Sequence, residues 1–280
     1  MADAGLTHAA WLERVPQLVE ECAAEWGLAI GEPYPAGAAG YVARADCADG
    51  TPAVLKLIYP HREAEHEADA LETWNGGGAV RLLARDDERW AMLIERCEPG
   101  TLLAHVECEA ALDVLIGLLP RLWKHGTALF RPLAEEAAWW IDYLPAEWNR
   151  AGRPFERRLL DEAIELLEWL SGSQGEQVLL HQDLHSDNVL AAQREPWLAI
   201  DPKPLVGERE FALAPIVRDF ELGHSRRRAL HRLDRLTSEL GLDRERACGW
   251  TLGQSVAWAF DSTYISTHLE TVRWLWEESS

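Results

Sequence analysis

The chain has 280 residues, of which 47 are acidic and 27 are basic, so its formal charge is −20 at pH 7. This length suits one domain or two joined lobes, and the 48% hydrophobic content is that of a folded globular protein. The negative charge excludes a general binder of nucleic acid or of anionic membranes, because phosphate groups would be repelled. It is compatible with a cationic partner and also with a plain soluble acidic surface.

The sequence contains no sign of membrane insertion or of a disulfide scaffold. No stretch reaches the roughly 18 uninterrupted apolar residues of a membrane span, and the first residues lack the features of a signal peptide. The five cysteines are scattered without a C-x-x-C pair, which predicts buried thiols in a reducing compartment. We therefore expect a cytoplasmic protein.

The N-terminal third is predicted to contain helices and strands in alternation. Residues 8–26 show the apolar spacing of an amphipathic helix, although Pro16 falls inside the pattern. An apolar run over 51–59 predicts a buried strand after a tight turn, and a charged, alanine-rich helix is expected over 62–74. Two further strands are expected over 80–84 and 90–96.

Helical periodicity dominates the remainder of the chain. This change of character predicts a small strand-rich lobe over residues 1–97 and a larger helical lobe over 98–280, with the ligand site between them. The helices are expected over 107–125, 134–149, 155–171, 226–240 and 244–260, with strand-like pieces at 177–180 and 188–200.

The densest polar cluster inside apolar sequence is V-L-L-H-Q-D-L-H-S-D-N-V-L, residues 178–190. Strand-like flanks place two histidines, two aspartates and an asparagine on one short loop, and burying such groups without a task would be costly. A second apolar strand, L-A-I-D-P-K, ends at Asp201. The pattern predicts a catalytic or metal site.

Two chemistries compete for this cluster. A metallohydrolase would use the alternating H-x-D-x-H-x-D residues as metal ligands. A phosphotransferase would use H-x-D-x-x-x-x-N with a second aspartate at a strand end. In that scheme Asp183 receives the proton of the attacking hydroxyl, while Asn188 and Asp201 give Mg²⁺ the oxygen ligands it prefers.

Lys56 and Glu67 favour the phosphotransferase. Lys56 is the lone charge in the strand A-V-L-K-L-I-Y, and Glu67 lies on the next predicted helix. A lysine in such a strand needs a partner on a packed helix, and a kinase needs this pair to hold the ATP phosphates. A metallohydrolase explains neither Lys56 nor Asp201.

Five segments of the chain occur in the order typical of aminoglycoside phosphotransferases, which share the protein-kinase fold. They are V-L-K-L, E-A-D-A-L, L-I-E-R-C-E-P-G, H-Q-D-L-H-S-D-N-V-L and A-I-D-P-K. The chain most resembles the branch that contains streptomycin 6-phosphotransferases and hydroxyurea phosphotransferases, through E-R-C-E-P-G, W-L-A-I-D-P-K and L-V-G-E. The resemblance implies an α+β fold of two lobes, a small β-rich N-lobe and a larger, mainly helical C-lobe.

The resemblance also implies roles for individual residues, with ATP as phosphoryl donor and Mg²⁺ as cofactor. Asp183 would be the catalytic base, Asn188 and Asp201 the magnesium ligands, and Lys56, paired with Glu67, a contact of the ATP phosphates. Backbone groups around Glu95 and Cys97 would bind the adenine, and G-A-A-G, residues Gly37 to Gly40, would cover the phosphates.

Several neighbouring positions carry weaker expectations. His181 would brace the catalytic loop, His185 would stabilise it by a hydrogen bond, and Lys203 is either a phosphate contact or a solvated surface lysine. Relatives usually have a small residue at Gln182, and they commonly have an aspartate, which braces the loop, at the position of Ala212. Asp219 could replace that aspartate.

The acceptor implied by the resemblance is an aminoglycoside, with streptomycin, phosphorylated at position 6, as the first choice. Its guanidinium groups would suit an acidic pocket in the helical lobe. Asp261 ends an apolar run and is a candidate, while Trp139 and Trp258 could stack on a cation or belong to the core. Further candidate carboxylates are Glu135, Glu136, Asp142 and Glu147.

Three alternatives remain. A kinase of the same fold could act on hydroxyurea or another small molecule. A non-catalytic nucleotide-binding pseudokinase would fit the departures at Gln182 and Ala212. A zinc-dependent hydrolase would lose activity to chelators and be indifferent to ATP.

Overall fold

The computed structural model describes residues 7–35, 40–260 and 265–279. Contacts within the chain define two compact units. The first comprises Met1–Thr101 with Ala191–Ile200, and the second comprises Leu102–Leu190 with Asp201–Ser280. The predicted class is confirmed, because the first unit is built on an antiparallel sheet and the second is mainly helical.

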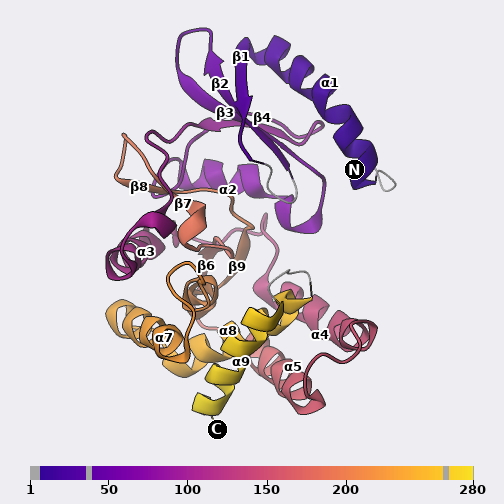
Figure 1. The fold of residues 1–280 in the computed structure, drawn as a ribbon, viewed down its shortest axis with the longest axis vertical. Coiled ribbons are helices and arrows are strands. Elements are labelled where there is room, and N and C mark those ends of the chain that lie inside the picture. Colours follow the sequence, from indigo (N-terminus) through magenta and orange to yellow (C-terminus); the bar gives the residue numbers. More distant parts are fainter. Residues whose placement is uncertain (1–6, 36–39, 261–264, 280) are drawn as a thin grey trace. The chain divides into compact units, whose positions relative to one another are not determined.

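The first unit contains a five-stranded antiparallel sheet with the strand order β1-β2-β3-β5-β4 (Figure 1). The predicted strands are confirmed as β3, β4 and β5, whereas β1 and β2 were not predicted. The strands are β1 (Leu28–Pro33), β2 (Gly40–Cys47), β3 (Pro52–Ile58), β4 (Leu82–Asp86) and β5 (Ala91–Glu95).

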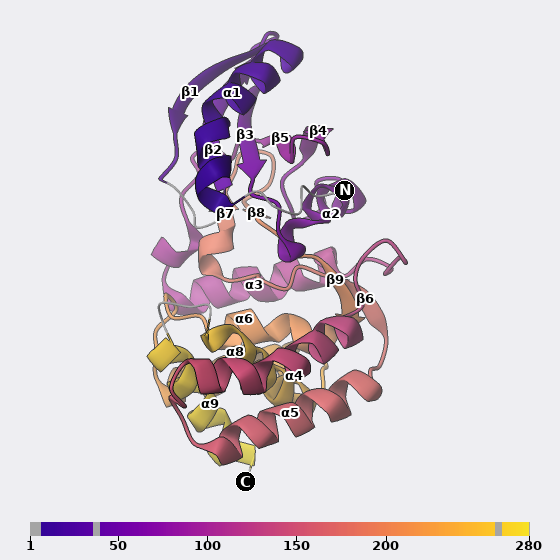
Figure 2. The same ribbon diagram turned by 90° about the vertical axis from the view of Figure 1, so that its right-hand side faces the viewer.

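Helix α1 (His8–Trp26) packs along this sheet, as both ribbon views show (Figures 1 and 2). The Thr7 side chain caps its first turn by accepting from the Ala10 amide at 3.2 Å, and Gly27 ends it with a φ of 64°. The predicted helix is confirmed at both ends, and it continues through Pro16. Its apolar face buries Trp11, Val15, Leu18 and Cys22 against the sheet.

The helix predicted over 62–74 is shorter than expected. A single 3₁₀ turn, Arg62–Ala64, is followed by α2 (Glu67–Trp74), because the backbone at His66 is not helical. The strand predicted over 188–200 is likewise divided into β7 (Val189–Ala191) and β8 (Trp197–Ala199), which pair with each other.

The second unit is a set of helices around α8, whose residues from Ala247 to Ala257 are all buried. Strands β6 (Gln177–Leu180) and β9 (Leu205–Glu208) form an antiparallel pair, and the catalytic loop follows β6. The five predicted helices are confirmed. The α-helices are α3 (Cys108–Leu122), α4 (Leu133–Arg150), α5 (Arg157–Gly172), α6 (Ala214–Val217), α7 (Arg226–Leu240), α8 (Arg244–Ala259) and α9 (Ile265–Ser279), of which α6 and α9 were not predicted.

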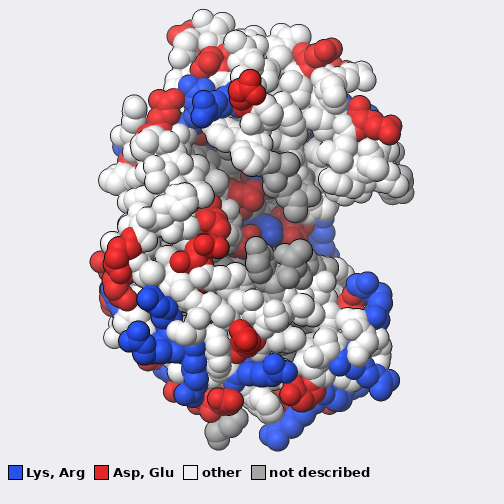
Figure 3. All heavy atoms as spheres, in the orientation of Figure 1, with Lys and Arg blue, Asp and Glu red and all other residues white. Residues whose placement is uncertain are grey.

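The net negative charge is not evenly spread. In the face shown in Figure 3, lysine and arginine side chains gather over the region of α7, which carries five arginines between Arg226 and Arg235. Among the helices of the described residues, none is long and apolar enough to cross a membrane.

Candidate active site

Lys56 and Glu67 form a buried ion pair in the first unit. Lys56 lies in β3 between Val42 of β2 and Met92 of β5, and Glu67 begins α2. Lys56 Nζ lies 2.6 Å from Glu67 Oε1, and both side chains are buried. The ion pair predicted between Lys56 and Glu67 is therefore present, and the contact of Lys56 with the ATP phosphates stays a prediction. An opposite charge at this distance offsets the desolvation of the ammonium and fixes its position on the sheet.

Glu95 ends β5, and Arg194 binds its carboxylate. Arg194 Nε and Nη2 lie 2.9 Å from the two Glu95 oxygens, and the Arg81 amide donates to Oε2 at 3.0 Å. Burial raises the pKa of Glu95, but these hydrogen bonds and the Arg194 charge outweigh burial and hold the pKa below its ordinary value. The Glu95 side chain thus stabilises the first unit.

Cys97 follows β5 and has a buried side chain. Burial raises the pKa of its thiol to about 12, so the group stays protonated and is a poor nucleophile. Its amide N–H has no hydrogen-bond partner among the described residues, as expected of a group that binds a ligand. Gly40 begins β2, where a Cβ would lie 2.9 Å from the Leu57 carbonyl oxygen, so sheet packing requires glycine. Gly37 lies outside the described residues.

The catalytic loop of the second unit begins where β6 ends. Gln182 has a φ of 63°, an unfavourable backbone conformation for a residue with a side chain, and it is buried. The His181 carbonyl oxygen accepts from the amides of Asp183 at 2.8 Å and Lys203 at 3.0 Å. His181 therefore braces the loop through its backbone and brings the segment that follows Asp201 beside it.

Asp183 faces a lysine that sequence analysis did not assign to it. Lys203 Nζ lies 3.2 Å from Asp183 Oδ2, and His185 Nε2 lies 3.8 Å from Oδ1. Burial raises the pKa of Asp183, but nearby positive charges, chiefly that of Lys203, outweigh burial and hold the pKa below its ordinary value. The carboxylate is thus ionised at neutral pH, as a proton acceptor must be.

His185 and Asn188 stabilise the loop from within. His185 Nδ1 accepts from the Asp187 amide at 3.3 Å, and His185 Nε2 lies 3.1 Å from Asn188 Nδ2. Asn188 Nδ2 also donates to the Asp183 carbonyl oxygen at 2.9 Å. The loop-stabilising contact predicted for His185 is confirmed, and the engaged amide nitrogen leaves the Asn188 oxygen as its ligand atom.

The donor set of the loop fits magnesium. Asp201 is exposed, with a φ of 58°, and offers a carboxylate, while Asn188 offers its amide oxygen. Mg²⁺ prefers such oxygen ligands and completes its shell with water and substrate phosphates. Within the described residues there is no group of three or more His, Cys, Asp or Glu side chains that could hold a metal ion.

Asp219 braces the catalytic loop from behind. Its carboxylate accepts from the Ser186 amide at 2.7 Å and from the amides of Glu221 and Leu222 at 3.0 and 3.3 Å. Ala212 is buried, and its methyl side chain cannot accept a hydrogen bond from the loop. Asp219, which from the sequence could replace an aspartate at position 212, thus does contact the loop.

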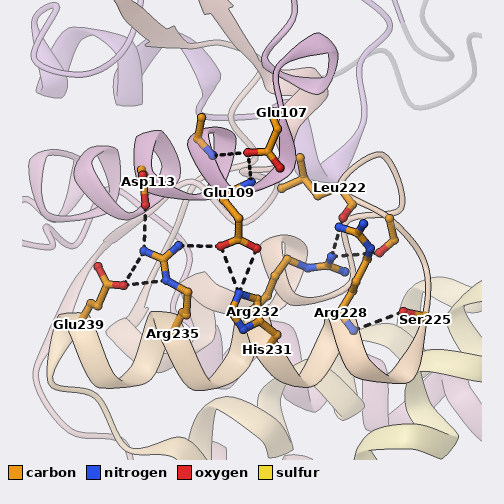
Figure 4. A network of polar contacts seen from close by, with 12 residues as sticks. Glu107, Glu109, Asp113, Leu222, Ser225, Arg228, His231, Arg232, Arg235 and Glu239 are labelled. Carbon is orange, nitrogen blue, oxygen red and sulfur yellow. Dashed lines mark hydrogen bonds and ion pairs between the residues drawn. The ribbon is translucent and has the colours of Figure 1, made fainter.

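Arg232 of α7 holds the segment that carries Asp219. Its guanidinium donates to the carbonyl oxygens of Val217, Leu222 and Gly223 at 2.8 to 3.1 Å. Figure 4 shows this side chain beside the polar contacts that join α7 to α3. There, Arg235 binds residues of α3 and α7, namely Glu109, Asp113 and Glu239.

The tryptophans expected near an acceptor differ in their surroundings. Trp139 on α4 is 42% exposed and packs against Tyr143, with a ring separation of 4.7 Å. The Trp258 ring lies under Lys203 Nζ at 4.6 Å and Arg218 Cζ at 4.7 Å, both cations of this chain. Trp140 is fully buried in the core.

The candidate acidic residues are largely engaged. Glu136 is buried and lies 2.6 Å from Arg131, and Glu147 pairs with Arg150 on α4. Asp261 lies outside the described residues. Trp139 is thus the exposed aromatic group among the described acceptor candidates. The structure also places Arg218 and Gln254 near Asp183, which the sequence did not indicate.

The fold is that of small-molecule kinases related to protein kinases. The choline kinase LicA from Streptococcus pneumoniae has a TM-score of 0.66 and 14% identity, over 94% of this chain and 99% of that chain. A thermostable mutant of aminoglycoside phosphotransferase APH(4)-Ia, in a complex with ADP and hygromycin B, has a TM-score of 0.64 and 12% identity, over 93% and 95%. At these identities the likeness concerns the fold alone.

Sequence relatives define the family. The streptomycin 6-kinase of Streptomyces glaucescens is 42% identical over 255 residues, covering 88% of this chain and 82% of the relative. The hydroxyurea phosphotransferase of Kitasatospora aureofaciens is 41% identical over 251 residues, covering 88% and 72%. The family of aminoglycoside/hydroxyurea antibiotic resistance kinases matches residues 29–263, and the chain belongs to it. It is therefore a small-molecule kinase, as sequence analysis predicted.

Proposed function

We propose that this protein transfers the γ-phosphoryl group of ATP, with Mg²⁺, to a hydroxyl of an aminoglycoside, with streptomycin at position 6 as the acceptor. The 42% identity to a streptomycin 6-kinase carries the choice of acceptor. The surroundings of Asp183 support the choice of reaction, because phosphoryl transfer requires an ionised carboxylate to accept the hydroxyl proton, and the Asn188 amide lies on the same loop.

In this proposal Asp183 accepts the proton of the attacking hydroxyl. Lys56 neutralises the negative charge of the ATP phosphates, and Glu67 fixes the position of the Lys56 ammonium. The amide of Cys97 and the backbone of Glu95 bind the adenine, and Gly37 to Gly40 cover the phosphates. Asn188 and Asp201 hold Mg²⁺, which supplies positive charge to the phosphate oxygens. The local cations allow a protein of charge −20 to bind a polyanion.

The acceptor side of the proposal rests on Trp139 and Asp261. Trp139 is exposed enough to stack on a guanidinium group, and a carboxylate would recognise it by paired hydrogen bonds. The brace from Asp219 to the catalytic loop favours an active enzyme over a pseudokinase, because the loop keeps its support without an aspartate at position 212.

The test is direct phosphorylation. Purified protein is incubated with Mg²⁺·ATP and streptomycin, and the product is analysed by mass spectrometry and NMR, with Asp183→Asn as the control. One added phosphate at position 6, absent with the control, is the expected result. ATP consumption without any phosphorylated aminoglycoside across a drug panel would refute the acceptor but not the kinase activity.

Hydroxyurea is the second candidate acceptor, because a hydroxyurea phosphotransferase is 41% identical to this chain. Hydroxyurea is small and uncharged, so its phosphorylation should not depend on a stacking aromatic or an acidic pocket. Replacing Trp139 by alanine should therefore raise the KM for streptomycin and leave that for hydroxyurea unchanged. Competition of both compounds in one reaction would identify the preferred acceptor.

A further inference from the structure

Trp258 of α8 contacts two cations near Asp183. Lys203 Nζ, which also lies 3.2 Å from Asp183 Oδ2, is 4.6 Å from the ring centroid, and Arg218 Cζ is 4.7 Å from it. A cation is attracted to the negative face of an indole ring, and more strongly where water is excluded. The Trp258 ring therefore holds the Lys203 ammonium beside Asp183. The ring face has no hydrogen-bond acceptor atom, so it does not compete with the Asp183 carboxylate for the ammonium.

Arg218 connects the ring to the other end of the catalytic loop. It is buried, and its Nη1 donates to Gln254 Oε1 at 2.7 Å, while Gln254 Nε2 donates to the Gln182 carbonyl oxygen at 3.3 Å. Because Gln254 and Trp258 are four residues apart, they share one face of α8. These contacts form a closed circuit of Asp183, Lys203, Trp258, Arg218, Gln254 and Gln182.

We propose that Lys203 is a second catalytic residue and that Trp258, backed by Arg218, positions its ammonium to stabilise the phosphoryl group during transfer. This inference rests on the proposed function. The acceptor hydroxyl oxygen must come within about 3 Å of the Asp183 carboxylate, and the phosphorus within about 3.5 Å of that oxygen. An ammonium 3.2 Å from Asp183 Oδ2 is then next to the reacting atoms.

In the step itself, the hydroxyl oxygen forms a bond to the γ-phosphorus, and the bond from that phosphorus to the β–γ bridging oxygen breaks. ADP leaves with the electron pair, and the hydroxyl proton passes to Asp183. Lys203 exchanges no proton or electron; its charge offsets that of the phosphoryl oxygens.

The test is a double-mutant cycle on the transfer rate, measured by rapid quench under single-turnover conditions. Lys203→Met should lower that rate about 100-fold, as expected for loss of one preorganised group at the transition state. Trp258→Leu should lower it about 10-fold, and Trp258→Phe less, because an aromatic ring is retained. If Trp258 acts through Lys203, the double variant should be no slower than Lys203→Met alone.

Matched measurements separate this role from a structural one. Nucleotide affinity and acceptor KM should change by less than about 3-fold in both single variants, since the interaction acts in the transition state. Lys203→Arg should recover part of the rate. Trp169→Leu on α5 is the control, because Arg246 lies over the Trp169 ring at 5.2 Å, and it should leave the rate unchanged.

The inference would be overturned if the rate loss of the double variant equalled the product of the two single losses. A normal rate in Lys203→Met would also overturn it. Thermal unfolding of each variant identifies rate losses that are due to misfolding, and Trp258→Phe serves if Trp258→Leu fails to fold. If no acceptor is phosphorylated, the rates of the four proteins in the cycle are measured for ATP hydrolysis instead. The test therefore still works if the proposed acceptor is wrong. A protein that transfers phosphoryl to neither acceptor nor water would refute both proposals.

Discussion

The carboxylate of Asp219 accepts the amide hydrogen of Ser186 at 2.7 Å, across 33 residues of sequence. This contact ties the catalytic loop to the segment before α7, and Arg232 in turn binds the carbonyl oxygens of that segment. The loop is thus supported by buried, charge-assisted hydrogen bonds, which are stronger than neutral ones.

Replacing Asp219 by alanine should destabilise the protein by about 1 to 3 kcal/mol, because buried amides lose their acceptor. It should also slow transfer, since Asp183 and Asn188 lie on the loop that is released. Urea unfolding and the transfer rate check both effects. Asp234→Ala, which removes an exposed partner of Arg244, is the control. Equal stabilities of the two variants would contradict the assigned brace.

Replacing Asp183 by asparagine should lower turnover about 1000-fold, within the range expected for loss of a positioned base. ADP affinity should stay near the wild-type value, because this residue is assigned to the hydroxyl and not to the nucleotide. Steady-state kinetics and titration calorimetry measure the two quantities. Turnover near the wild-type rate would remove Asp183 from the base position.

Replacing Glu67 by glutamine leaves the ammonium of Lys56 without its charged partner in a buried place. We expect a loss of about 2 kcal/mol or more in unfolding free energy and a higher KM for ATP. The double variant Lys56→Met, Glu67→Leu should regain stability but not ATP binding. Glu162→Gln, which breaks the more exposed pair with Arg158, should cost under about 1 kcal/mol. Unchanged ATP kinetics in Glu67→Gln would argue against the pair's role.

Removing a magnesium ligand should show itself in metal dependence. Asp201→Ala should raise the Mg²⁺ concentration for half-maximal activity about 10-fold or more, by analogy with other lost metal-site groups. Its ADP affinity measured with EDTA should match the wild-type value. Asp187→Ala, next to Asn188 in the catalytic loop but outside the donor set, should keep the normal Mg²⁺ dependence. The same Mg²⁺ dependence in all three proteins would exclude Asp201 from the metal site.

His268 of α9 should make the protein sensitive to acid. Burial, with the charge of Arg218, lowers the pKa of His268 from 6.5 to about 3. Between these values the unfolded chain binds a proton that the folded chain does not, so stability falls as pH decreases below 6.5. At about 1.4 kcal/mol per pH unit, the loss by pH 5 is about 2 kcal/mol.

Replacing His268 by glutamine should remove that part of the pH dependence of unfolding in urea. His105→Gln, at an exposed position, serves as the matched control. An identical fall in stability between pH 6.5 and 5 for His268→Gln and the wild type would show that His268 is not responsible.

Local pattern was enough to predict much of the fold. The helices α1, α3, α4, α5, α7 and α8 follow from apolar spacing, because a helix buries one face and repeats every 3.6 residues. Strand β1 escaped prediction because Gly31 and Pro33 interrupt it, and β2 because the buried positions of its alternation are alanines. Helix α2 began later than predicted, because the backbone of His66 departs from the helical conformation.

The sequence by itself determined the catalytic loop, the Lys56–Glu67 pair and the family of kinases, because these depend on residue type and short spacing. Only the tertiary structure decided what surrounds Asp183. Lys203, Arg218 and Trp258 come from separate segments, and Arg218 reaches Gln254 across 36 residues. Such contacts depend on how helices and strands pack, and no local pattern records packing. The structure therefore placed a lysine against the base, where the sequence left its role open between a phosphate contact and a solvated side chain.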